Sequence, residues 1–252
     1  MHKQTGKCSP WMVETRPGVG RVVLAARDIQ PFELVMRDAN LLGRVMVDAK
    51  ACVLCGGRKE GEKDYLSKKT PFYVSDSELR KCDCGFEKCK TECSGDQQHL
   101  VECSSLQTLN IQNKTLKDKN KILMSLGFWR MIKLEHYHSE KWKSLMNLTS
   151  HREMRNKSKR FHKSVKFLHD KLNLIGIHVD EDVLPTLQGI LETNSHSFNK
   201  NIHHIFGNFS LISHSCIPNC EHLLAGEQAI VRAKVMIKMG EEITIRYSDT
   251  EG

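Results

Sequence analysis

The stretch "SHSCIPNC", Ser213–Cys220, places one histidine, two cysteines and two serines within eight residues. Three interpretations are open: a nucleophile, part of a metal site, or a loop that holds another group. A nucleophile requires a neighbouring base and a group that orients that base, and the sequence identifies no such arrangement here. A tetrahedral zinc site needs four ligands, of which Cys216 and Cys220 supply only a part. The third interpretation, a loop that holds another group, is therefore favoured.

The composition is that of an ordinary globular chain. Of its 252 residues, 39% are hydrophobic and 27% are charged, which permits a buried core. Apolar runs such as "RVVLAA" are far shorter than the roughly 20 residues that span a bilayer, and "MHKQTGKCSPW" lacks the apolar stretch of a secretory signal. We therefore expect an intracellular protein with no membrane association. Disulfides are rare inside cells, so metal binding is the leading explanation for the ten cysteines.

Seven of these cysteines lie between residues 52 and 103, together with a histidine. The pattern is C-x2-C, a long gap, and then C-x-C-x4-C-x3-C-x5-H-x3-C. Zinc prefers four thiolate or imidazole ligands, so eight ligands make two closed, structural sites. The predicted ligands are Cys52, Cys55, Cys82, Cys84, Cys89, Cys93, His99 and Cys103.

Residues 105–193 are predicted to be helical. Apolar side chains recur there at helical spacing in two places: Phe161, Val165, Leu168 and Leu172, and then Val183, Leu187 and Ile190. Between Lys114 and Lys171, sixteen Lys/Arg stand against five Asp/Glu, in a chain of net charge +8. This segment suits contact with nucleic acid or acidic protein, or a solvated helical surface. The sequence favours the solvated surface, because charge runs usually are solvated.

Residues 11–50 and 202–248 are predicted to be β-rich. "RVVLAARDI" and "QPFELV" indicate strands in the first part, and "EQAIVRAKVMI" and "EEITIRY" indicate strands in the second, with "KMGEE" as a turn. Neither part is large enough to fold alone. We expect the two parts to form one domain that the cysteine module and the helices interrupt.

The order of metal ligands resembles the MYND zinc finger, which has two cysteine pairs, then Cys-x3-Cys, then His-x3-Cys. That family interleaves its ligands between two zinc ions. The resemblance therefore implies one zinc on Cys52, Cys55, Cys89 and Cys93, and a second on Cys82, Cys84, His99 and Cys103. The segment "CDC" has one intervening residue where the family usually has two.

The chain as a whole resembles the SET and MYND domain (SMYD-type) family of protein-lysine methyltransferases, in its divergent arthropod branch. The matching motifs, in order, are "GVGRVVLAARDIQPFEL" from Gly18, "LTSH" from Leu148, "ETNSHSF" from Glu192, "SHSCIPN" from Ser213 and "GEEITIRY" from Gly240. The resemblance implies an α+β fold. A split β-rich SET domain, residues 1–50 and 194–252, would be interrupted by a MYND-type finger at 52–103 and a helical insert at 105–193.

The resemblance also implies a reaction, the transfer of a methyl group from S-adenosylmethionine to a lysine of a histone or another protein. The amine must be neutral, although lysine has a pKa of about 10.4, and the rest is chiefly positioning. Tyr247 is implied as the catalytic tyrosine. The implied cofactor-binding residues are Gly18, Gly20, Arg21, Asn194, Ser213 and His214. The resemblance further implies partner peptides for the finger, a role in transcription regulation, and a place in the nucleus and cytoplasm.

Departures from the family pattern support an alternative function. Ser213 stands where the family has Asn, and Phe32 where it usually has Gly. The sequence given ends at "YSDTEG", without the post-SET pattern C-x-C-x2-C of the family. The alternative is a catalytically weak or inactive adaptor that binds partner proteins through its finger.

Overall fold

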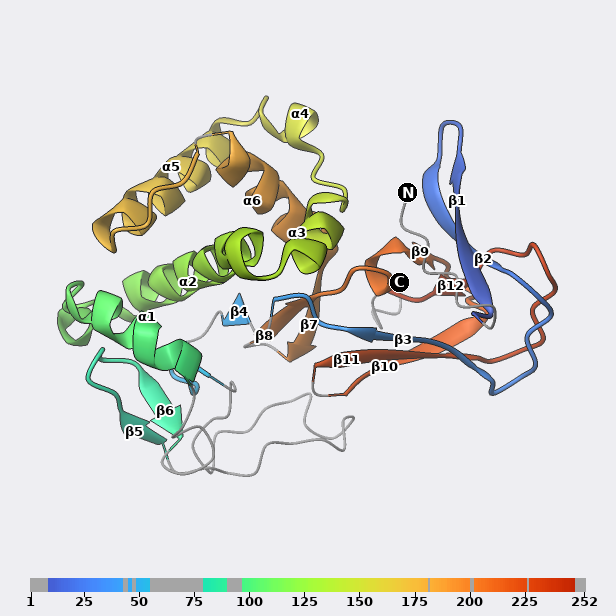
Figure 1. The fold of residues 1–252 in the computed structure, drawn as a ribbon, viewed down its shortest axis with the longest axis horizontal. Coiled ribbons are helices and arrows are strands. Elements are labelled where there is room, and N and C mark those ends of the chain that lie inside the picture. Colours follow the sequence, from blue (N-terminus) through green and yellow to red (C-terminus); the bar gives the residue numbers. More distant parts are fainter. Residues whose placement is uncertain are drawn as a thin grey trace. The chain divides into compact units, whose positions relative to one another are not determined.

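The computed structural model describes residues 9–42, 45–46, 49–54, 79–89, 97–180, 182–199, 202–225 and 227–247. The chain has a mixed α/β fold and divides into two compact units, which are described separately (Figure 1). The sheet unit comprises Met1–Asn40 and Phe206–Gly252, and the helical unit comprises Leu41–Ile205. The two ends of the sequence therefore fold together. None of the described helices is both long and apolar enough to span a membrane.

The sheet unit is built from short, mostly antiparallel strands. They are β1 Trp11–Arg16, β2 Gly20–Ala25, β3 Leu34–Ala39, β9 Ser213–His214, β10 Cys220–Ala225, β11 Gln228–Ala233 and β12 Thr244–Ile245. β1 pairs with β2, β11 lies between β10 and β3, and β9 pairs with β12 in parallel. The predicted strand in "RVVLAARDI" is β2, whose Val22–Ala25 are buried because the run is apolar throughout.

The core of the sheet unit joins residues from both ends of the chain. It includes Val23, Ala25, Val35, Met36, Phe206, Phe209, Ile212, Ala229, Val231, Ile243 and Ile245. Phe206 and Phe209 pack edge to face at 5.5 Å. The buried Asp38 carboxylate accepts the backbone N–H groups of Asn208, at 2.7 Å, and Phe209, at 2.8 Å. These bonds fix the short 3-10 helix η2, Phe209–Leu211, which leads into β9.

Two of the predicted strands are shorter than expected. "EQAIVRAKVMI" forms a strand only over Gln228–Ala233, and "EEITIRY" only over Thr244–Ile245. After β11 the chain turns away, and the Lys234 N–H donates to the Asn219 carbonyl at 2.8 Å. Val235 and Met236 are exposed there, and Ile237, at the end of the run, returns to the core.

Phe32 adopts a left-handed backbone conformation, with φ 66° and a side chain that is 74% exposed. Its N–H donates to the Ala233 carbonyl at 2.8 Å, which holds this conformation. A non-glycine residue pays roughly 1–2 kcal/mol there, whereas glycine costs about 1 kcal/mol or less through unfolded-state entropy. We expect Phe32→Gly to raise the free energy of unfolding by up to about 1 kcal/mol. Urea denaturation measures this, and Phe32→Ala should show no gain; equal stabilities of the two variants would contradict the prediction.

The helical unit contains six α-helices among its described residues. They are α1 Gln97–Gln107, α2 Leu116–Tyr137, α3 Ser139–Met146, α4 Arg152–Arg155, α5 Lys159–Leu174 and α6 Val183–Asn194. The other elements are β4 Val45–Met46, β5 Leu79–Lys81, β6 Glu87–Cys89, η1 Ile111–Asn113, β7 Ser195–Asn199 and β8 Ile202–Ile205. β8 lies between β4 and β7, and β5 pairs with β6.

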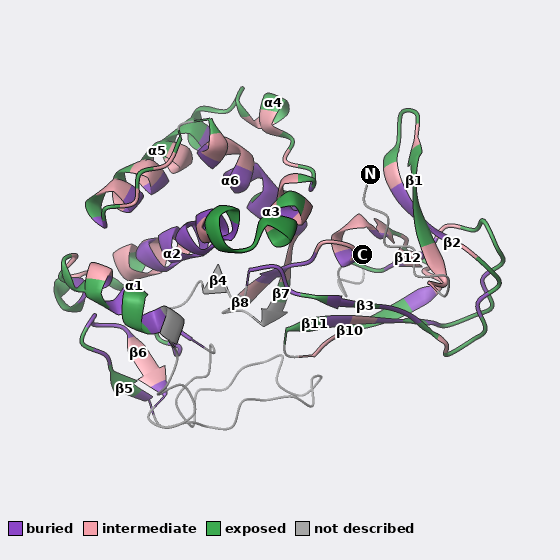
Figure 2. Cartoon of the chain, viewed as in Figure 1, coloured by how far each residue is buried: buried purple, intermediate pink, exposed green. Residues whose placement is uncertain are grey.

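The helical periodicities predicted from the sequence mark buried faces (Figure 2). Phe161, Leu168 and Leu172 are buried on α5, and Leu187 and Ile190 are buried on α6. Helical structure begins at Gln97 rather than at residue 105.

Candidate active site and metal centre

The loop that begins at Ser213 is hydrogen-bonded to β12 and to the segment just before it. β9 pairs in parallel with β12, so that Ser213 lies opposite Thr244 and His214 opposite Ile245. The Ser213 hydroxyl donates to the Glu242 carboxylate at 2.5 Å. The predicted ligand-facing residues therefore lie on a short parallel pair of strands, and the Ser213 hydroxyl is engaged with a carboxylate.

Asn219 links the same two segments from the other side of the loop. Its amide Nδ2 donates to the Glu242 carbonyl at 2.8 Å, and its Oδ1 accepts the Thr244 N–H at 2.9 Å. Sequence reasoning did not predict these bonds between Asn219 and the segment at Glu242. The signal was present, because both residues belong to the quoted motifs "GEEITIRY" and "SHSCIPN".

Tyr247 is held against the same loop by its backbone, ring and hydroxyl. Its N–H donates to Nδ1 of His214 at 3.1 Å, and the two rings lie 5.3 Å apart. Its hydroxyl donates to the Ile212 carbonyl at 2.5 Å. Tyr247 as a whole is 58% exposed, but the partial burial of its phenol raises the pKa above its ordinary value, so the hydroxyl stays neutral at physiological pH. The phenol oxygen is thus fixed in place, and its lone pairs can still accept a hydrogen bond.

The β1–β2 hairpin presents bare backbone at its turn. Gly18 and Gly20 have φ of 75° and 96°, and nothing lies within 4 Å of a Cβ built on either residue. Leu24 forms an isolated antiparallel bridge with Glu242, and the Ile243 N–H donates to the Val23 carbonyl at 2.8 Å, so β2 lies beside the segment that leads into β12. Burial lowers the pKa of Arg21 from its ordinary value. The glycines are required by their positive φ, and the open space beside them leaves room for a ligand.

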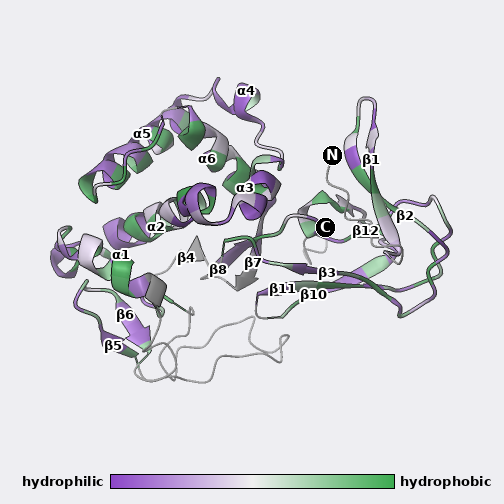
Figure 3. Ribbon diagram, viewed as in Figure 1, coloured by the Kyte–Doolittle hydropathy of each residue, from purple (hydrophilic) through white to green (hydrophobic). Residues whose placement is uncertain are grey.

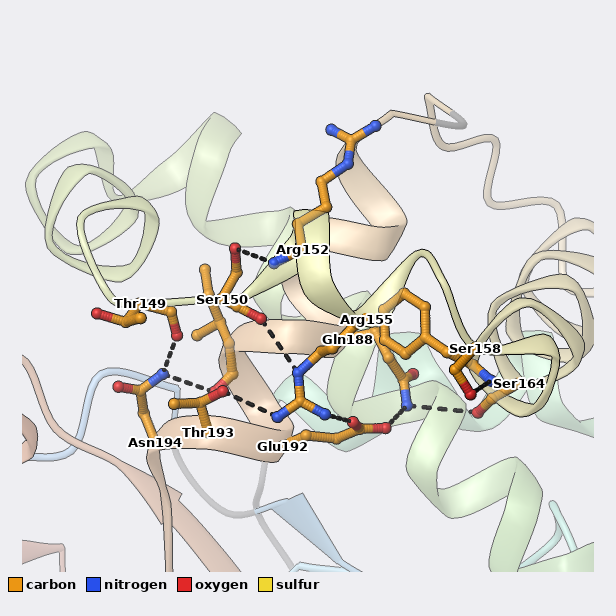
Figure 4. Close-up of polar contacts among 12 residues, drawn as sticks. Thr149, Ser150, Arg152, Arg155, Ser158, Ser164, Gln188, Glu192, Thr193 and Asn194 are labelled. Atoms are coloured by element: carbon orange, nitrogen blue, oxygen red, sulfur yellow. Dashed lines mark hydrogen bonds and ion pairs between the residues drawn. The ribbon is translucent and has the colours of Figure 1, made fainter.

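Asn194 ends α6 in the helical unit and is buried. Its Nδ2 donates to the carbonyls of Thr149 and Ile190, both at 2.8 Å. An amide has two N–H donors, so in this structure both act within the helical unit. The bonds tie the predicted motif "LTSH" to the end of α6 (Figure 4).

Four predicted metal ligands come together in the helical unit. The ligand atoms of Cys82, Cys84, His99 and Cys103 all lie within 4.8 Å of one another, and all four residues are buried. The Cys82 Sγ is 3.2 Å from Nε2 of His99 and 3.5 Å from the Cys103 Sγ. These are the residues that the resemblance assigned to one zinc, so the single residue between Cys82 and Cys84 does not keep them apart.

A hairpin and a helix position this cluster. Cys82 and Cys84 lie in the turn between β5 and β6, where Gly85 has φ 92° and a Cβ would meet Gln112 at 3.0 Å. His99 and Cys103 are four residues apart on α1 and so share one face. α1 is held by a buried ion pair in which Arg130 of α2 donates to both Glu102 oxygens, at 2.9 and 2.8 Å.

The donor set fits a structural zinc ion. Ligands at about 2.3 Å from a tetrahedral zinc are about 3.8 Å from one another, close to the separations observed. Burial, the largest cause, raises the pKa values of the Cys84 and Cys103 thiols. A buried group of thiols without a cation would therefore hold its protons, and a bound zinc would instead stabilise the thiolates.

The second predicted set is only partly described. Cys52 and Cys89 are buried, and the Cys89 N–H donates to the Cys52 Sγ at 3.3 Å. Cys55 and Cys93 lie outside the described residues. The structure therefore places two members of that set side by side.

Comparisons with known proteins were made for the whole chain. A family model described as "SET domain" matches residues 20–248. A search of curated proteins gave no match. Among solved structures, the SET domain of LSMT bound to lysine and AdoHcy is 13% identical, covers 98% of this chain and 51% of that chain, and has a TM-score of 0.48.

Two structures of Rubisco LSMT are also similar. The one bound to sinefungin and monomethyllysine is 13% identical, covers 98% of this chain and 50% of that chain, and has a TM-score of 0.44. The one bound to AdoMet is 14% identical, covers 97% of this chain and 49% of that chain, and has a TM-score of 0.38. The chain thus spans about half the length of these structures.

Proposed function

The chain belongs to the SET-domain family, whose model matches residues 20–248, and on this premise we propose that it transfers methyl groups from S-adenosylmethionine to protein lysines. The observation that carries the proposal is the arrangement around Tyr247. A neutral phenol is fixed beside His214, on the short strand pair that joins the two sequence motifs. S-adenosylmethionine would supply the methyl group.

The role that we propose for Tyr247 is to aim the substrate amine. Its proton is donated to the Ile212 carbonyl, so its oxygen can accept an N–H from the lysine. A phenol whose pKa is raised by burial is a poor base at neutral pH, so it orients the amine rather than taking its proton. The lysine must then lose its proton to water, and the rate should rise with pH below the ordinary lysine pKa of about 10.4.

The cofactor contacts that we propose in the sheet unit are Gly18, Gly20, Arg21, Ser213 and His214. The bare glycine backbone allows close approach of a ligand. The Ser213 hydroxyl is committed to Glu242, so we propose that residue 213 contributes its backbone rather than its side chain. In this proposal Glu242 holds the loop in place, which is part of the role that the longer Asn side chain of the family would have at position 213.

We also propose that the chain belongs to the SET and MYND domain-containing subfamily, in its arthropod branch. The four-ligand cluster at Cys82, Cys84, His99 and Cys103 supports it. We propose a second zinc on Cys52, Cys55, Cys89 and Cys93, a finger over residues 52–103 that binds partner peptides, and a helical insert over 105–193. The two parts of the SET domain would be 1–50 and 194–252, and the protein would act in the nucleus and cytoplasm on gene expression.

The experiment is a methyl-transfer assay with radiolabelled S-adenosylmethionine and lysine-rich proteins, histones among them. We expect transfer by the chain and a fall of at least about tenfold for Tyr247→Phe, equivalent to about 1.4 kcal/mol. Cofactor affinity, measured by calorimetry, should change little, because the variant keeps the ring and the backbone N–H.

Tyr137→Phe is the matched control, because Tyr137 is 73% exposed in the helical unit. Transfer that is equal for both variants would overturn the role of Tyr247. The absence of transfer and of cofactor binding would favour the alternative, an adaptor that binds partner proteins without catalysis. The engaged Ser213 hydroxyl is the observation that favours this second candidate.

A further inference from the structure

α5 has one hydrophobic face and one hydrophilic face (Figure 3). Phe161, Leu168 and Leu172 are buried, whereas Lys159, Lys163 and Lys166 are exposed. Residues three and four positions apart lie on the same side of a helix. The three lysines therefore form a row about 10 Å long, at 1.5 Å per residue.

These cations have no carboxylate partner among the described residues. On the neighbouring α4, Arg152 pairs with Asp182 and Arg155 pairs with Glu192. By contrast, a second group of exposed side chains forms no ion pair within the described residues: Lys157, Lys159, Arg160, Lys163 and Lys166. The two α4 cations are thus paired, whereas the α5 row forms no ion pair in the described part of the chain, and Asp170, four residues after Lys166, is the only acidic residue of α5.

The charge row works against the stability of the helix itself. The first turn of α5 carries Lys159 and Arg160 and no acidic residue, although a helix N-terminus favours negative charge. Lys159 and Lys163 are also like charges at i and i+4, which destabilises a helix. A bound anion would relieve both effects.

The positive surface continues onto α2 through Phe167. The Lys171 ammonium lies 5.3 Å from the centre of that ring, and the Lys121 ammonium from α2 lies 4.8 Å from it. The surface is therefore a rigid feature of two packed helices rather than a flexible tail. Its regular row of cations suits a ligand whose anions repeat along a line.

We propose that the outer face of α5, Lys159, Arg160, Lys163 and Lys166, together with Lys157 just before the helix, binds the sugar-phosphate backbone of nucleic acid without reading its sequence. Phosphate contacts come from Lys and Arg side chains and from helix N-termini, and α5 offers both. An acidic peptide is the other class of polyanion, but in a natural peptide the carboxylates are spaced by its sequence, whereas nucleic acid carries a phosphate at every backbone repeat. This binding is independent of the proposed methyl transfer.

The test uses the whole chain and a fluorescent 20-base-pair DNA duplex of arbitrary sequence, followed by fluorescence anisotropy. Wild-type Kd should rise steeply between 50 and 200 mM salt, because each neutralised phosphate adds about 0.9 to the slope of log K against log salt. Lys159→Gln, Lys163→Gln and Lys166→Gln together should raise Kd at least tenfold and lower that slope by about 2–3.

A charge-matched control replaces three other helix lysines, with Lys117→Gln, Lys141→Gln and Lys143→Gln. These side chains are exposed but lie off the α5 row, so this variant should bind within about threefold of wild type. Equal losses in the two triple variants would overturn the proposal, since net charge alone would then explain binding. Equally effective competition by a polyglutamate peptide of the same charge would also overturn it, in favour of an acidic protein partner. Circular dichroism should show unchanged helix content, because glutamine keeps helix propensity.

Discussion

Replacing Cys82 with serine is expected to remove one zinc ion per chain and to loosen the part of the helical unit that the ion joins. The Cys82 Sγ lies closest to two other ligands, at 3.2 Å from His99 and 3.5 Å from Cys103. It therefore connects the β5–β6 turn to α1. A structural zinc contributes on the order of 10 kcal/mol of binding free energy that is also folding free energy. Its loss should cost several kcal/mol and expose residues 79–107 to proteolysis.

Zinc content by mass spectrometry and limited proteolysis together measure this effect. Cys216→Ser is the matched control, because Cys216 is an exposed thiol of the sheet unit; it should leave zinc content unchanged. A Cys82→Ser protein that keeps all of its zinc and its protease resistance would contradict the assignment. Cys52→Ser should remove the other proposed ion separately, so that the double variant retains none.

The pH dependence of zinc binding has a definite sign. Burial raises the pKa values of the Cys84 and Cys103 thiols above the ordinary value, so the metal-free thiols are protonated at neutral pH. Each thiolate that zinc captures therefore releases a proton, and affinity should fall by up to about tenfold per pH unit for each thiol as pH decreases. Competition with a chelator at pH 7.5 and 6.0 measures this fall. An affinity independent of pH would mean that the thiols are not the ligands.

The resemblance to the MYND zinc finger implied which four ligands meet, and local geometry explains only the two pairs within that set. His99 and Cys103 are one helical turn apart, and Cys82 and Cys84 share one turn of a hairpin, so local geometry determines both pairs. The two buried strips on α5 and α6 followed from periodicity for the same reason. In each case the contact depends on neighbours a few residues away.

The contacts that sequence reasoning missed join distant segments. Nothing near Asp38 indicates that its carboxylate accepts N–H groups of Asn208 and Phe209. The hydroxyl of Ser213 could point to a ligand or to Glu242, and only the register of β9 with β12 decides between them. The Asn194 amide likewise donates one of its two bonds to the Thr149 carbonyl, 45 positions away. Chain topology determines these pairings, and one sequence does not encode it in any local pattern.

Gly189→Ala is expected to destabilise the protein, although the same change stabilises most helices. Alanine is about 1 kcal/mol better than glycine in a helix interior. At this position a Cβ would lie 2.2 Å from the Ser150 carbonyl oxygen and 3.0 Å from its carbon. The loop cannot move away freely, because Asn194 holds Thr149 at 2.8 Å and Arg155 holds the Ser150 carbonyl at 3.2 Å (Figure 4). The clash must therefore be relieved by shifting α6 or by breaking those bonds.

The expected net loss is about 2–3 kcal/mol, the usual cost of overpacking a tight contact, or a fall in Tm of about 5–10 °C for a chain of this size. Gly176→Asn is the matched control. Gly176 has φ 76° with nothing within 4 Å of its Cβ, and asparagine tolerates that conformation, so its cost should stay below about 1 kcal/mol. Thermal and urea denaturation of both variants measure the difference. If Gly189→Ala proved as stable as wild type, the close approach of α6 to Ser150 would be wrong. If it proved destabilised while Gly176→Asn did not, the loss would come from the Ser150 contact rather than from losing a glycine.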